Sequence, residues 1–442
     1  MINITGVIEM ALTFKGGFHP EENKRLTEGK KIIEVPPPDI MVIPLGQHIG
    51  AVCDPLVNVG DQVCVGQKIG DSKEFLSVPV HASVSGKVIA IEKRSHPNLV
   101  ECMAVVIEND HKKTVLPSIK PIANFESMSS EELIHHIRES GMVGMGGATF
   151  PTFVKLSPPA GKKVDVVILN GAECEPYLTA DHRVMLEKAF HVVDGLRIMM
   201  KILNVKKGLI VIEDNKKDAY EVIKKECKFC EGVSAVLVKT KYPQGSEKQI
   251  ISAVLKREVK SGMLPVDAGV VVQNVASSAY ISKYFRTGMP LIRRALTVAG
   301  SGCEIPNNLR VRIGTPFSHV ASFAGVKDGI VKVLAGGPMM GTAIFDLSVP
   351  VIKGTSGILF FTEKEYKNYK ESDCQKCGRC VDRCPMRLMP CYITDYALLN
   401  NLEESVKYGL KDCMECGCCS YICPSRRHLV QTIRVAKTKI PR

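Results

Sequence analysis

Cys374-Gln-Lys-Cys377-Gly-Arg-Cys380-Val-Asp-Arg-Cys384-Pro385 recurs 39 residues later as Cys413-Met-Glu-Cys416-Gly-Cys-Cys419-Ser-Tyr-Ile-Cys423-Pro424. Three thiolates at such short intervals can wrap around one cuboidal iron–sulfur cluster, and the fourth cysteine then reaches a neighbouring cluster. The duplicated pattern therefore predicts a C-terminal helical domain that holds two [4Fe-4S] clusters.

The ligands are assigned by exchanging the fourth cysteine of each copy, as in two-cluster bacterial ferredoxins. One cluster takes Cys374, Cys377, Cys380 and Cys423, and the other takes Cys413, Cys416, Cys419 and Cys384. Zinc is the alternative for Cys-x-x-Cys pairs, but tetrahedral zinc sites usually join two such pairs across a longer loop. The cysteines outside the pattern are expected to be ordinary thiols; they include Cys227, Cys230, Cys391 and Cys418.

The whole chain has 442 residues, 17 cysteines and a formal net charge of +12. Because a single core usually stops growing near ~250 to 300 residues, we expect several domains. The first residues lack a basic segment followed by a long apolar one, which favours a reducing compartment. Apolar runs fall short of the ~18 residues of a membrane span. With no Trp and few aromatic residues, the positive charge does not indicate a nucleic-acid groove.

Residues 41–107 alternate in hydrophobicity between turns rich in Gly and Asp, which predicts a compact all-β unit. The segments Val59-Gly-Asp-Gln-Val-Cys-Val-Gly-Gln67 and Ser85-Gly-Lys-Val88 resemble the barrel-sandwich hybrid of biotinyl and lipoyl carriers. Since no lysine lies in the hairpin context that those carriers modify, we expect a structural role for this unit.

From residue 120 onward strand-like and helical patterns alternate, which predicts an open α/β layer with a largely parallel sheet. Strands are expected at 164–169, 208–212, 233–238 and 269–272, and helices at 181–203, 215–226, 246–259 and 276–285. Ser129 and Glu132 form a capping box for an earlier helix that ends at Gly141. Short segments at 295–298 and 310–313 predict a small β-rich domain.

A glycine-rich loop runs through Gly141-Met-Val-Gly144-Met-Gly146-Gly147-Ala148-Thr-Phe150-Pro151. Such a loop lets backbone N–H groups approach an anion such as a phosphate, although a bare tight turn would also explain it. The next strand ends in Asn170-Gly-Ala-Glu173-Cys-Glu175-Pro176, which places an amide and two carboxylates where α/β sheets bind ligands. Surface acids in a loop are the alternative.

The loop and this strand end resemble the flavin-bearing NADH-binding subunit of respiratory complex I. In that family a G-x-G-G-A-x-F-P loop and an N-A-D-E-x-E-P segment line a shared pocket for FMN and nicotinamide. Tyr242-Pro-Gln-Gly245-Ser-Glu247 is similar to the family's Y-x-x-G-E-E, and Gln273-Asn274-Val275 is similar to its N-N-V. Departures from the pattern are Val143 and Met145 in place of arginines, Thr149 and Phe153 in place of glycines, Ala172 in place of an aspartate and Ser246 in place of a glutamate.

Over nearly its whole length the chain resembles the C subunits of Rnf electron-transport complexes. The shared order is Phe14-Lys-Gly-Gly-Phe-His-Pro20, the β hybrid unit, the flavin-type loop, a β-rich domain similar to a soluble-ligand-binding β-grasp and the doubled cysteine motif. The resemblance implies a multidomain α/β plus all-β fold. Its expected parts are a barrel-sandwich hybrid at 1–118, a Rossmann-like FMN/NADH-binding domain at 119–290, a β-grasp domain at 291–345 and a ferredoxin-like domain at 364–442.

The resemblance also implies the cofactor-site residues. FMN would be cradled by Gly144, Gly146, Gly147, Ala148, Phe150 and Lys155, with Asn170 and Asn274 as polar contacts. Near the flavin or the nicotinamide would lie Glu173, Glu175, Tyr242, Gly245 and Glu247. No protein group has to act as a catalyst, because FMN itself carries the hydride chemistry.

The function implied by the resemblance is that of a peripheral protein on the cytoplasmic side of the cell membrane. It would exchange electrons with NAD(H), reach ferredoxin through a partner protein of the same complex, and be coupled by the other subunits to Na+ or H+ translocation. Two other functions fit the same motifs: a soluble NADH-dependent flavoprotein module of a hydrogenase-type enzyme, and a flavin-free electron relay.

Overall fold

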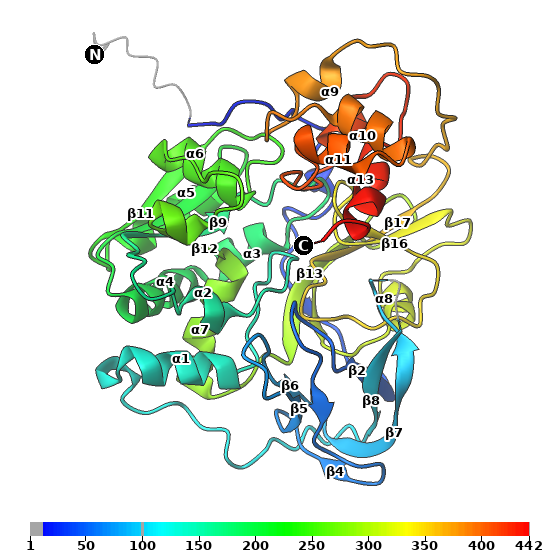
Figure 1. Cartoon of the computed structure of the whole chain (residues 1–442). Coiled ribbons are helices and arrows are strands. Elements are labelled where there is room, and N and C mark those ends of the chain that lie inside the picture. The colour runs from blue at the N-terminus through cyan, green and yellow to red at the C-terminus, as the bar shows by residue number, and fades with distance from the viewer. Residues whose placement is uncertain (1–11, 99–100, 442) are drawn as a thin grey trace, which may run out of the picture.

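The computed structural model describes residues 12–98 and 101–441; residues 1–11, at the start of the expected first domain, lie outside the described residues. Within this part of the chain the strands form four sheets, and the last helices form a separate bundle (Figure 1). None of the helices found in 12–98 and 101–441 is both long enough and apolar enough to cross a membrane.

The N-terminal β unit consists of two small antiparallel sheets, with strand orders β2-β8-β7-β4 and β3-β5-β6. Its strands are β2 (Ile40–Pro44), β3 (Asp54–Pro55), β4 (Gln62–Val63), β5 (Lys68–Asp71), β6 (Val80–His81), β7 (Gly86–Ser95) and β8 (Glu101–Asn109). Both sheets contribute to one core, with Met41 and Val88 from the first and Ile69 from the second. The all-β unit expected for 41–107 is therefore confirmed.

The α/β unit contains a fully parallel sheet in the order β11-β10-β9-β12. Its strands are β9 (Val166–Gly171), β10 (Gly208–Glu213), β11 (Val233–Val238) and β12 (Val270–Asn274). Its helices are α1 (Ser130–Glu139), α2 (Thr152–Lys155), α3 (Ala180–Glu187), α4 (Ala189–Leu203), α5 (Lys217–Cys227), α6 (Glu247–Leu255) and α7 (Val275–Thr287). The expected alternation, the parallel sheet and the Ser129–Glu132 capping box are confirmed. The single helix expected at 181–203 is instead two helices, α3 and α4, because Lys188 between them leaves the helical conformation.

Both faces of this sheet are covered, which explains why its strands are continuously apolar. Val167 and Leu169 of β9 point into a core that they share with α4, α5 and α7, whereas Val166 and Ile168 point into a second core with α6. The carboxyl ends of β9 and β12 are neighbours, since Asn170 pairs with Asn274 in the sheet. The loops after these two strands therefore start side by side.

The β-rich unit is one six-stranded mixed sheet in the order β1-β14-β13-β17-β15-β16. Its elements are β1 (Ile33–Glu34), β13 (Arg293–Ala299), β14 (Asn307–Arg312), α8 (Phe317–Phe323), β15 (Lys332–Ala335), β16 (Thr342–Ile344) and β17 (Gly357–Phe361). Two of these strands, β1 and β17, lie outside the expected range of 291–345. Strand β17 pairs with both β13 and β15 and so joins the two halves of the sheet, and β1 pairs with β14 at its edge.

The C-terminal bundle is made of α9 (Arg379–Asp382), α10 (Pro390–Leu398), α11 (Leu402–Lys407), α12 (Cys418–Ile422) and α13 (Leu429–Thr438). Ile393, Leu410 and Ile433 fill its small core. A core of this size buries little apolar surface, so contacts with the rest of the molecule and bound clusters are needed to hold it.

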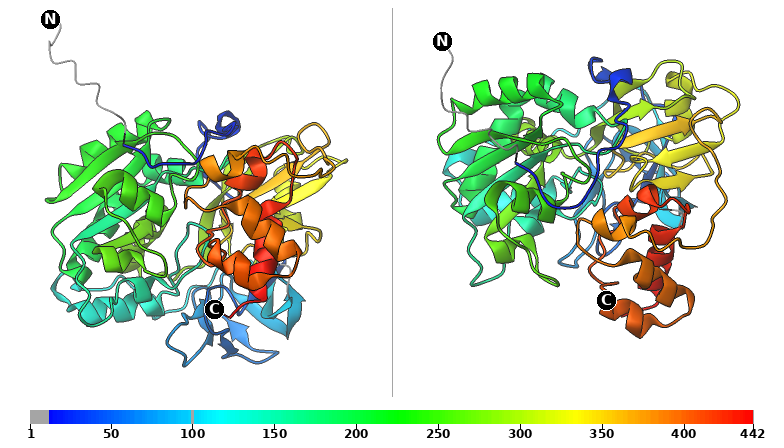
Figure 2. Two further views of the ribbon diagram at one scale, coloured as in Figure 1. Left: turned by 45° about the horizontal axis from the view of Figure 1, so that its top comes forward. Right: turned by 90° about the horizontal axis from the view of Figure 1, so that it is seen from above.

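The N-terminal segment joins this bundle to the α/β unit (Figure 2). Leu12 pairs with the end of β11, and Phe18 pairs with Tyr242. The N–H of Gly17 donates to the C=O of Arg383 (2.9 Å). Gly16 has a φ of +82°, and a Cβ there would lie 2.6 Å from the carbonyl oxygen of Cys384. Only glycine lets the segment approach the cysteine motif this closely.

Candidate functional site

The glycine-rich loop folds as a narrow hairpin between α1 and α2. The N–H of Gly144 donates to the C=O of Phe150 (2.9 Å), and the N–H of Thr152 donates to the C=O of Met142 (3.1 Å). Gly147 has a φ of +109° and Thr149 a φ of +52°. Thr149 therefore adopts the left-handed conformation that glycine favours, at a position where the complex I pattern has glycine.

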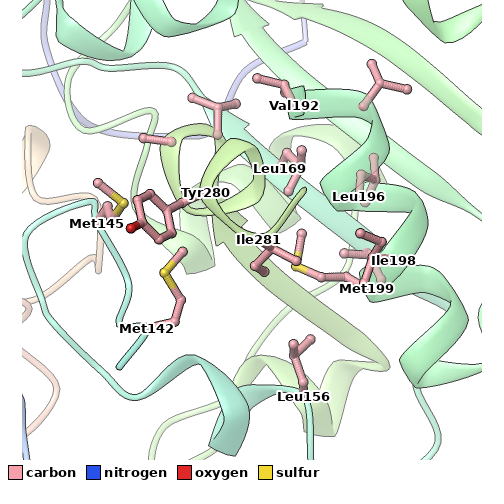
Figure 3. Close-up of a cluster of buried hydrophobic side chains, with 14 of the residues drawn as sticks. Met142, Met145, Leu156, Leu169, Val192, Leu196, Ile198, Met199, Tyr280 and Ile281 are labelled. Carbon is pink, nitrogen blue, oxygen red and sulfur yellow. The ribbon is translucent and has the colours of Figure 1, made fainter. Parts of the chain in front are cut away.

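The apolar residues of the loop anchor it in the core of the α/β unit. Met142, Val143 and Met145 are buried. Figure 3 shows the side chains of Met142 and Met145 beside Tyr280 of α7. Positions 143 and 145, which hold arginines in complex I subunits, are thus core positions here, and they bring no charge to the loop.

The tip of the loop is exposed and has free donors. Gly146, Gly147 and Ala148 are exposed. No hydrogen bond within the described part of the chain uses the backbone N–H of these three residues. Consecutive free N–H groups in a glycine-rich turn form a site that fits an anion, so the loop fits the phosphate of a flavin nucleotide.

Two asparagines hold the ends of β9 and β12. The Nδ2 of Asn170 donates to the C=O of Gly245 (2.6 Å), and its Oδ1 accepts from the N–H of Ala172 (3.1 Å). Asn274 caps α7, because its Oδ1 accepts from the N–H groups of Ala276 (2.8 Å) and Ser277 (3.2 Å). A Cβ built on Gly146 would lie 3.6 Å from Asn274, so the loop tip and the end of β12 are neighbours.

The two glutamates after β9 bind different parts of the molecule. The carboxylate of Glu173 accepts from the N–H groups of Asp181 (2.7 Å) and His182 (3.0 Å), which caps α3. The carboxylate of Glu175 accepts from the N–H groups of Met339 (3.0 Å) and Met340 (2.9 Å) in the β-rich unit. Burial raises the pKa of Glu175 to about 7. Glu173 is therefore bound within the α/β unit, whereas Glu175 links the α/β unit to the β-rich unit.

Lys155 and Glu247 form an ion pair, and Lys155 also donates to the C=O of Val272 (3.3 Å). Tyr242 is buried and faces the cysteines, with its hydroxyl donating to the C=O of Cys416 (2.8 Å). The structure thus brings the loop tip, Asn170, Glu173, Gly245 and Asn274 to one sheet edge. It places Glu175 and Tyr242 between that edge and the cysteine motif.

The second cysteine motif encloses a cavity lined by sulfur and apolar side chains. Four of the lining residues are the ligands expected for one cluster: Cys384, Cys413, Cys416 and Cys419. The N–H of Leu388 donates to the Sγ of Cys384 (3.3 Å), and that of Glu415 donates to the Sγ of Cys413 (3.4 Å). Backbone N–H groups aimed at sulfur stabilise thiolates, so this donor set fits a buried [4Fe-4S] cluster.

The first motif lies nearer the surface. Cys374 and Cys377 are exposed, and Cys380 lies beside Cys391. The segment after Cys423 runs along the start of this motif, because the N–H of Ser372 donates to the C=O of Ser425 (3.0 Å). In the described residues no three Cys, His, Asp or Glu side chains are close enough to hold a single metal ion. A four-iron cluster is larger than one ion and needs its thiolates further apart.

Three residues of the site carried no motif in the sequence. Asp181 accepts from the Nδ2 of Asn274 (2.6 Å), and burial followed by the charge of Glu173 raises its pKa to about 7. Ser277 accepts from the N–H of Met145 (2.9 Å) through its Oγ. Arg294 donates to the C=O of Met145 (3.1 Å). The separation of Arg294 from the loop is about one third of the chain, so no local pattern could have revealed it.

Three family models match the chain. Residues 12–112 match the RnfC barrel sandwich hybrid domain, residues 137–283 match the Nuo51 FMN-binding domain, and residues 366–424 match a 4Fe-4S dicluster domain.

Curated relatives are similar over almost the whole chain. The C subunit of the Na(+)-translocating ferredoxin:NAD(+) oxidoreductase complex of Acetobacterium woodii is 48% identical over 97% of this chain and 97% of its own length. The C subunit of the proton-translocating complex of Clostridium ljungdahlii is 48% identical over 97% of this chain and 94% of its own. The C subunit of the ion-translocating oxidoreductase complex of Rhodobacter capsulatus is 41% identical over 97% of this chain and 83% of its own length.

Among solved structures, an NAD+-reducing [NiFe]-hydrogenase in the H2-reduced state has a TM-score of 0.50 and 16% identity. The match covers 73% of this chain and 65% of that one, and it shows a shared fold alone.

Proposed function

The chain belongs to the family of C subunits of ion-translocating ferredoxin:NAD(+) oxidoreductase complexes, and from this premise we propose that it exchanges electrons between NAD(H) and two [4Fe-4S] clusters through FMN. When bound, FMN interconverts two-electron hydride transfer and single-electron transfer. The protein supplies the binding sites and their spacing.

The observation that carries this proposal is the direct contact between the strand-end site and the buried cysteine motif. Gly245 is bonded to Asn170 at the sheet edge, and Tyr242, three residues earlier, is bonded to Cys416. One short segment of chain therefore touches both sites. Such proximity is what electron transfer between a flavin and a cluster requires.

We propose the following roles for the residues of the site. The free N–H groups of the loop tip bind the flavin phosphate, and the core anchors Met142 and Met145 hold the loop in place. Glu173 and Asp181 keep the ends of α3 and β9 fixed beside Asn274. The cysteines of the buried motif hold the cluster that meets the flavin, and the exposed motif holds the cluster that meets the partner.

The family also supports a wider proposal. The relatives' names describe ion-translocating complexes with ferredoxin and NAD(+) as reactants, so we propose that this chain is a peripheral subunit on the cytoplasmic side of the membrane. The other subunits would hold it there, reach ferredoxin and couple electron transfer to Na+ or H+ movement. We also propose the domain limits 1–118, 119–290, 291–345 and 364–442, with β-grasp and ferredoxin-like identities for the last two and with the third extended to residue 361 so that it includes β17. The three family matches lie within these limits.

The test is the cofactor content of the anaerobically isolated full chain. We expect FMN together with acid-labile sulfide for two clusters, and bleaching of both cofactors when NADH is added. A chain that holds iron but no FMN, and that NADH does not reduce, would contradict the proposal and leave a flavin-free relay.

A further inference from the structure

Met145 is held from two units of the fold, through the two peptide groups that flank it. The N–H of Met145 donates to the Oγ of Ser277 in α7 (2.9 Å), and its C=O accepts from the Nη2 of Arg294 in β13 (3.1 Å). Met145 itself is buried. The α/β unit and the β-rich unit therefore fix this residue together.

The planarity of the peptide carries this constraint into the loop tip. In a trans peptide the C=O of one residue and the N–H of the next point in opposite directions. Because the C=O of Met145 points at Arg294, the N–H of Gly146 points away from Arg294. That N–H belongs to an exposed residue, and no hydrogen bond in the described part of the chain uses it.

Arg294 also brings a charge that no acid pairs with directly. It is 3% exposed, and in the described part of the chain its guanidinium donates to backbone carbonyl oxygens and to no carboxylate. Its Nη1 donates to the C=O of Lys353 (2.5 Å). Lys353 is buried as well, and its Nζ donates to the C=O groups of Gly141 (2.7 Å) and Pro79 (2.9 Å). Two buried cations from the β-rich unit thus bind the backbone carbonyls at the two ends of the segment 141–145, Lys353 at Gly141 and Arg294 at Met145.

Burying the charged side chains of Arg294 and Lys353 costs free energy, which indicates a functional role for them. Burial lowers the pKa of Arg294 to about 10, a shift that the charge of Asp181 partly offsets, and it lowers the pKa of Lys353 to about 8. An unpaired buried cation is destabilising unless something of opposite charge binds nearby. The loop carries no arginines at 143 and 145, and Arg294 and Lys353 bring positive charge to its backbone from behind.

We propose that Arg294 is a positioning residue for the flavin phosphate: it orients the Met145–Gly146 peptide so that the Gly146 N–H faces the ligand, and it supplies the positive charge that the loop lacks. Lys353 supports it from the same side. This inference rests on the proposed function, because it assumes that the loop tip binds the phosphate of FMN.

The experiment compares FMN with riboflavin, which lacks the phosphate. Flavin is removed from the full chain with its clusters retained, and both ligands are titrated by equilibrium dialysis. The variants are Arg294→Met and Arg294→Lys, with Arg293→Met as the matched control. Arg293 is the preceding residue of the same strand, but its side chain is bound to Glu34 (3.1 Å) near the surface.

Arg294→Met is expected to weaken FMN binding by about 10-fold or more, which corresponds to one charge-assisted hydrogen bond, and to leave riboflavin binding unchanged. Arg294→Lys keeps the charge but not the forked donors, so its loss of FMN affinity is expected to be smaller. Arg293→Met should behave like the wild type. If Arg294→Met does not fold, Arg294→Lys alone still tests whether FMN affinity falls relative to riboflavin.

The inference is overturned if FMN and riboflavin weaken equally in a folded Arg294 variant, or if neither weakens. In both cases the wild type still binds FMN and the proposed function survives. A wild-type chain that binds no FMN overturns the proposed function and this inference with it.

Discussion

The two copies of the cysteine motif have the same spacing but different surroundings. In the second copy, Cys416 and Cys419 are each 7% exposed. Cys384, which is expected to complete the same ligand set from the first copy, is 8% exposed. In the first copy, Cys374 and Cys377 are exposed. Equal spacing thus predicts equal ligand chemistry, whereas the difference in burial predicts different roles.

The buried copy is covered by residues from the other units. Tyr242 contacts Cys416, and a Cβ on Gly417 would lie 2.9 Å from the carbonyl oxygen of Met339. The Nε2 of Gln249 donates to the C=O of Pro385 (3.2 Å). Of the other three cysteines of the first copy, two have neighbours from the bundle itself: Cys380 lies beside Cys391, and Cys374 lies beside Arg427. On the proposed assignment, one cluster would face inward to the flavin side, and the other would face solvent or a partner.

The largest expected effect comes from removing one ligand from each copy. Cys416→Ala and Cys377→Ala should each cost roughly half of the iron, because each breaks one of two clusters. Only Cys416→Ala should prevent NADH from reducing the remaining cluster, since the flavin-facing relay is lost. Electron paramagnetic resonance of the NADH-treated variants measures this. If Cys377→Ala blocks reduction of the remaining cluster instead, the assigned order of the two clusters is reversed.

The next effect concerns the segment that holds the buried copy in place. Phe18 stacks on Tyr421 with ring centroids 4.4 Å apart and meets Tyr242 edge-on at 5.9 Å. Phe18→Ala should destabilise the docked bundle by about 3 to 5 kcal/mol, as for other buried aromatic residues. Denaturant titration followed by cluster absorbance measures the loss. Phe345→Ala is the control, because Phe345 is 87% exposed; an equal loss in both variants would contradict the proposed role of Phe18.

The third effect depends on pH and tests the electrostatics beside the buried copy. Burial raises the pKa of Glu175 from 4.5 to about 7, so the folded protein holds this proton more tightly than the unfolded chain. The resulting stabilisation is complete below pH 4.5 and is lost as pH rises through 7. Glu175→Gln lacks this titration, so the stability of the wild type relative to the variant should fall by up to about 3 kcal/mol between pH 5 and pH 8.

Thermal unfolding of the two proteins across this pH range measures that change. The exposed Glu363 provides the control Glu363→Gln, which should follow the wild type at every pH. A difference between the wild type and Glu175→Gln that stays constant with pH would show that the carboxyl of Glu175 is ionised throughout.

The smallest expected effect is the loss of one hydrogen bond at the buried copy. Tyr242→Phe keeps the ring but leaves the C=O of Cys416 without its donor, which should cost about 1 to 2 kcal/mol. Denaturant titration measures it against Tyr392→Phe, whose ring lies half exposed in the bundle. Should Tyr242→Phe match the wild type in stability and in the rate of cluster reduction, the hydroxyl has no part in joining the two sites.

Much of the fold followed from local patterns. The alternation after residue 120 predicted the parallel sheet, and the capping box of α1 formed between Ser129 and Glu132 as its spacing predicted. The β-rich unit was harder to delimit. Its sheet includes β1 and β17, which pair with strands far along the chain, and pairing over such separations leaves no local pattern.

Some residues of the candidate site could likewise be placed from the sequence, and others could not. The asparagines at the ends of β9 and β12 could be placed from the sequence, because parallel strands end at one edge of a sheet. The contacts of Glu175 and Tyr242 could not, since their partners lie in the β-rich unit and in the bundle. The same holds for Arg294, which supports the glycine-rich loop from another sheet.

The sequence by itself predicted the ligand sets and determined the parallel sheet and the glycine-rich loop, because each depends on the spacing of neighbouring residues along a helix, a strand or a turn. Only the tertiary structure decided which cysteine motif is buried and which buried cations stand behind the loop. Those properties come from contacts between distant segments, and burial and charge pairing exist only once those segments have packed together.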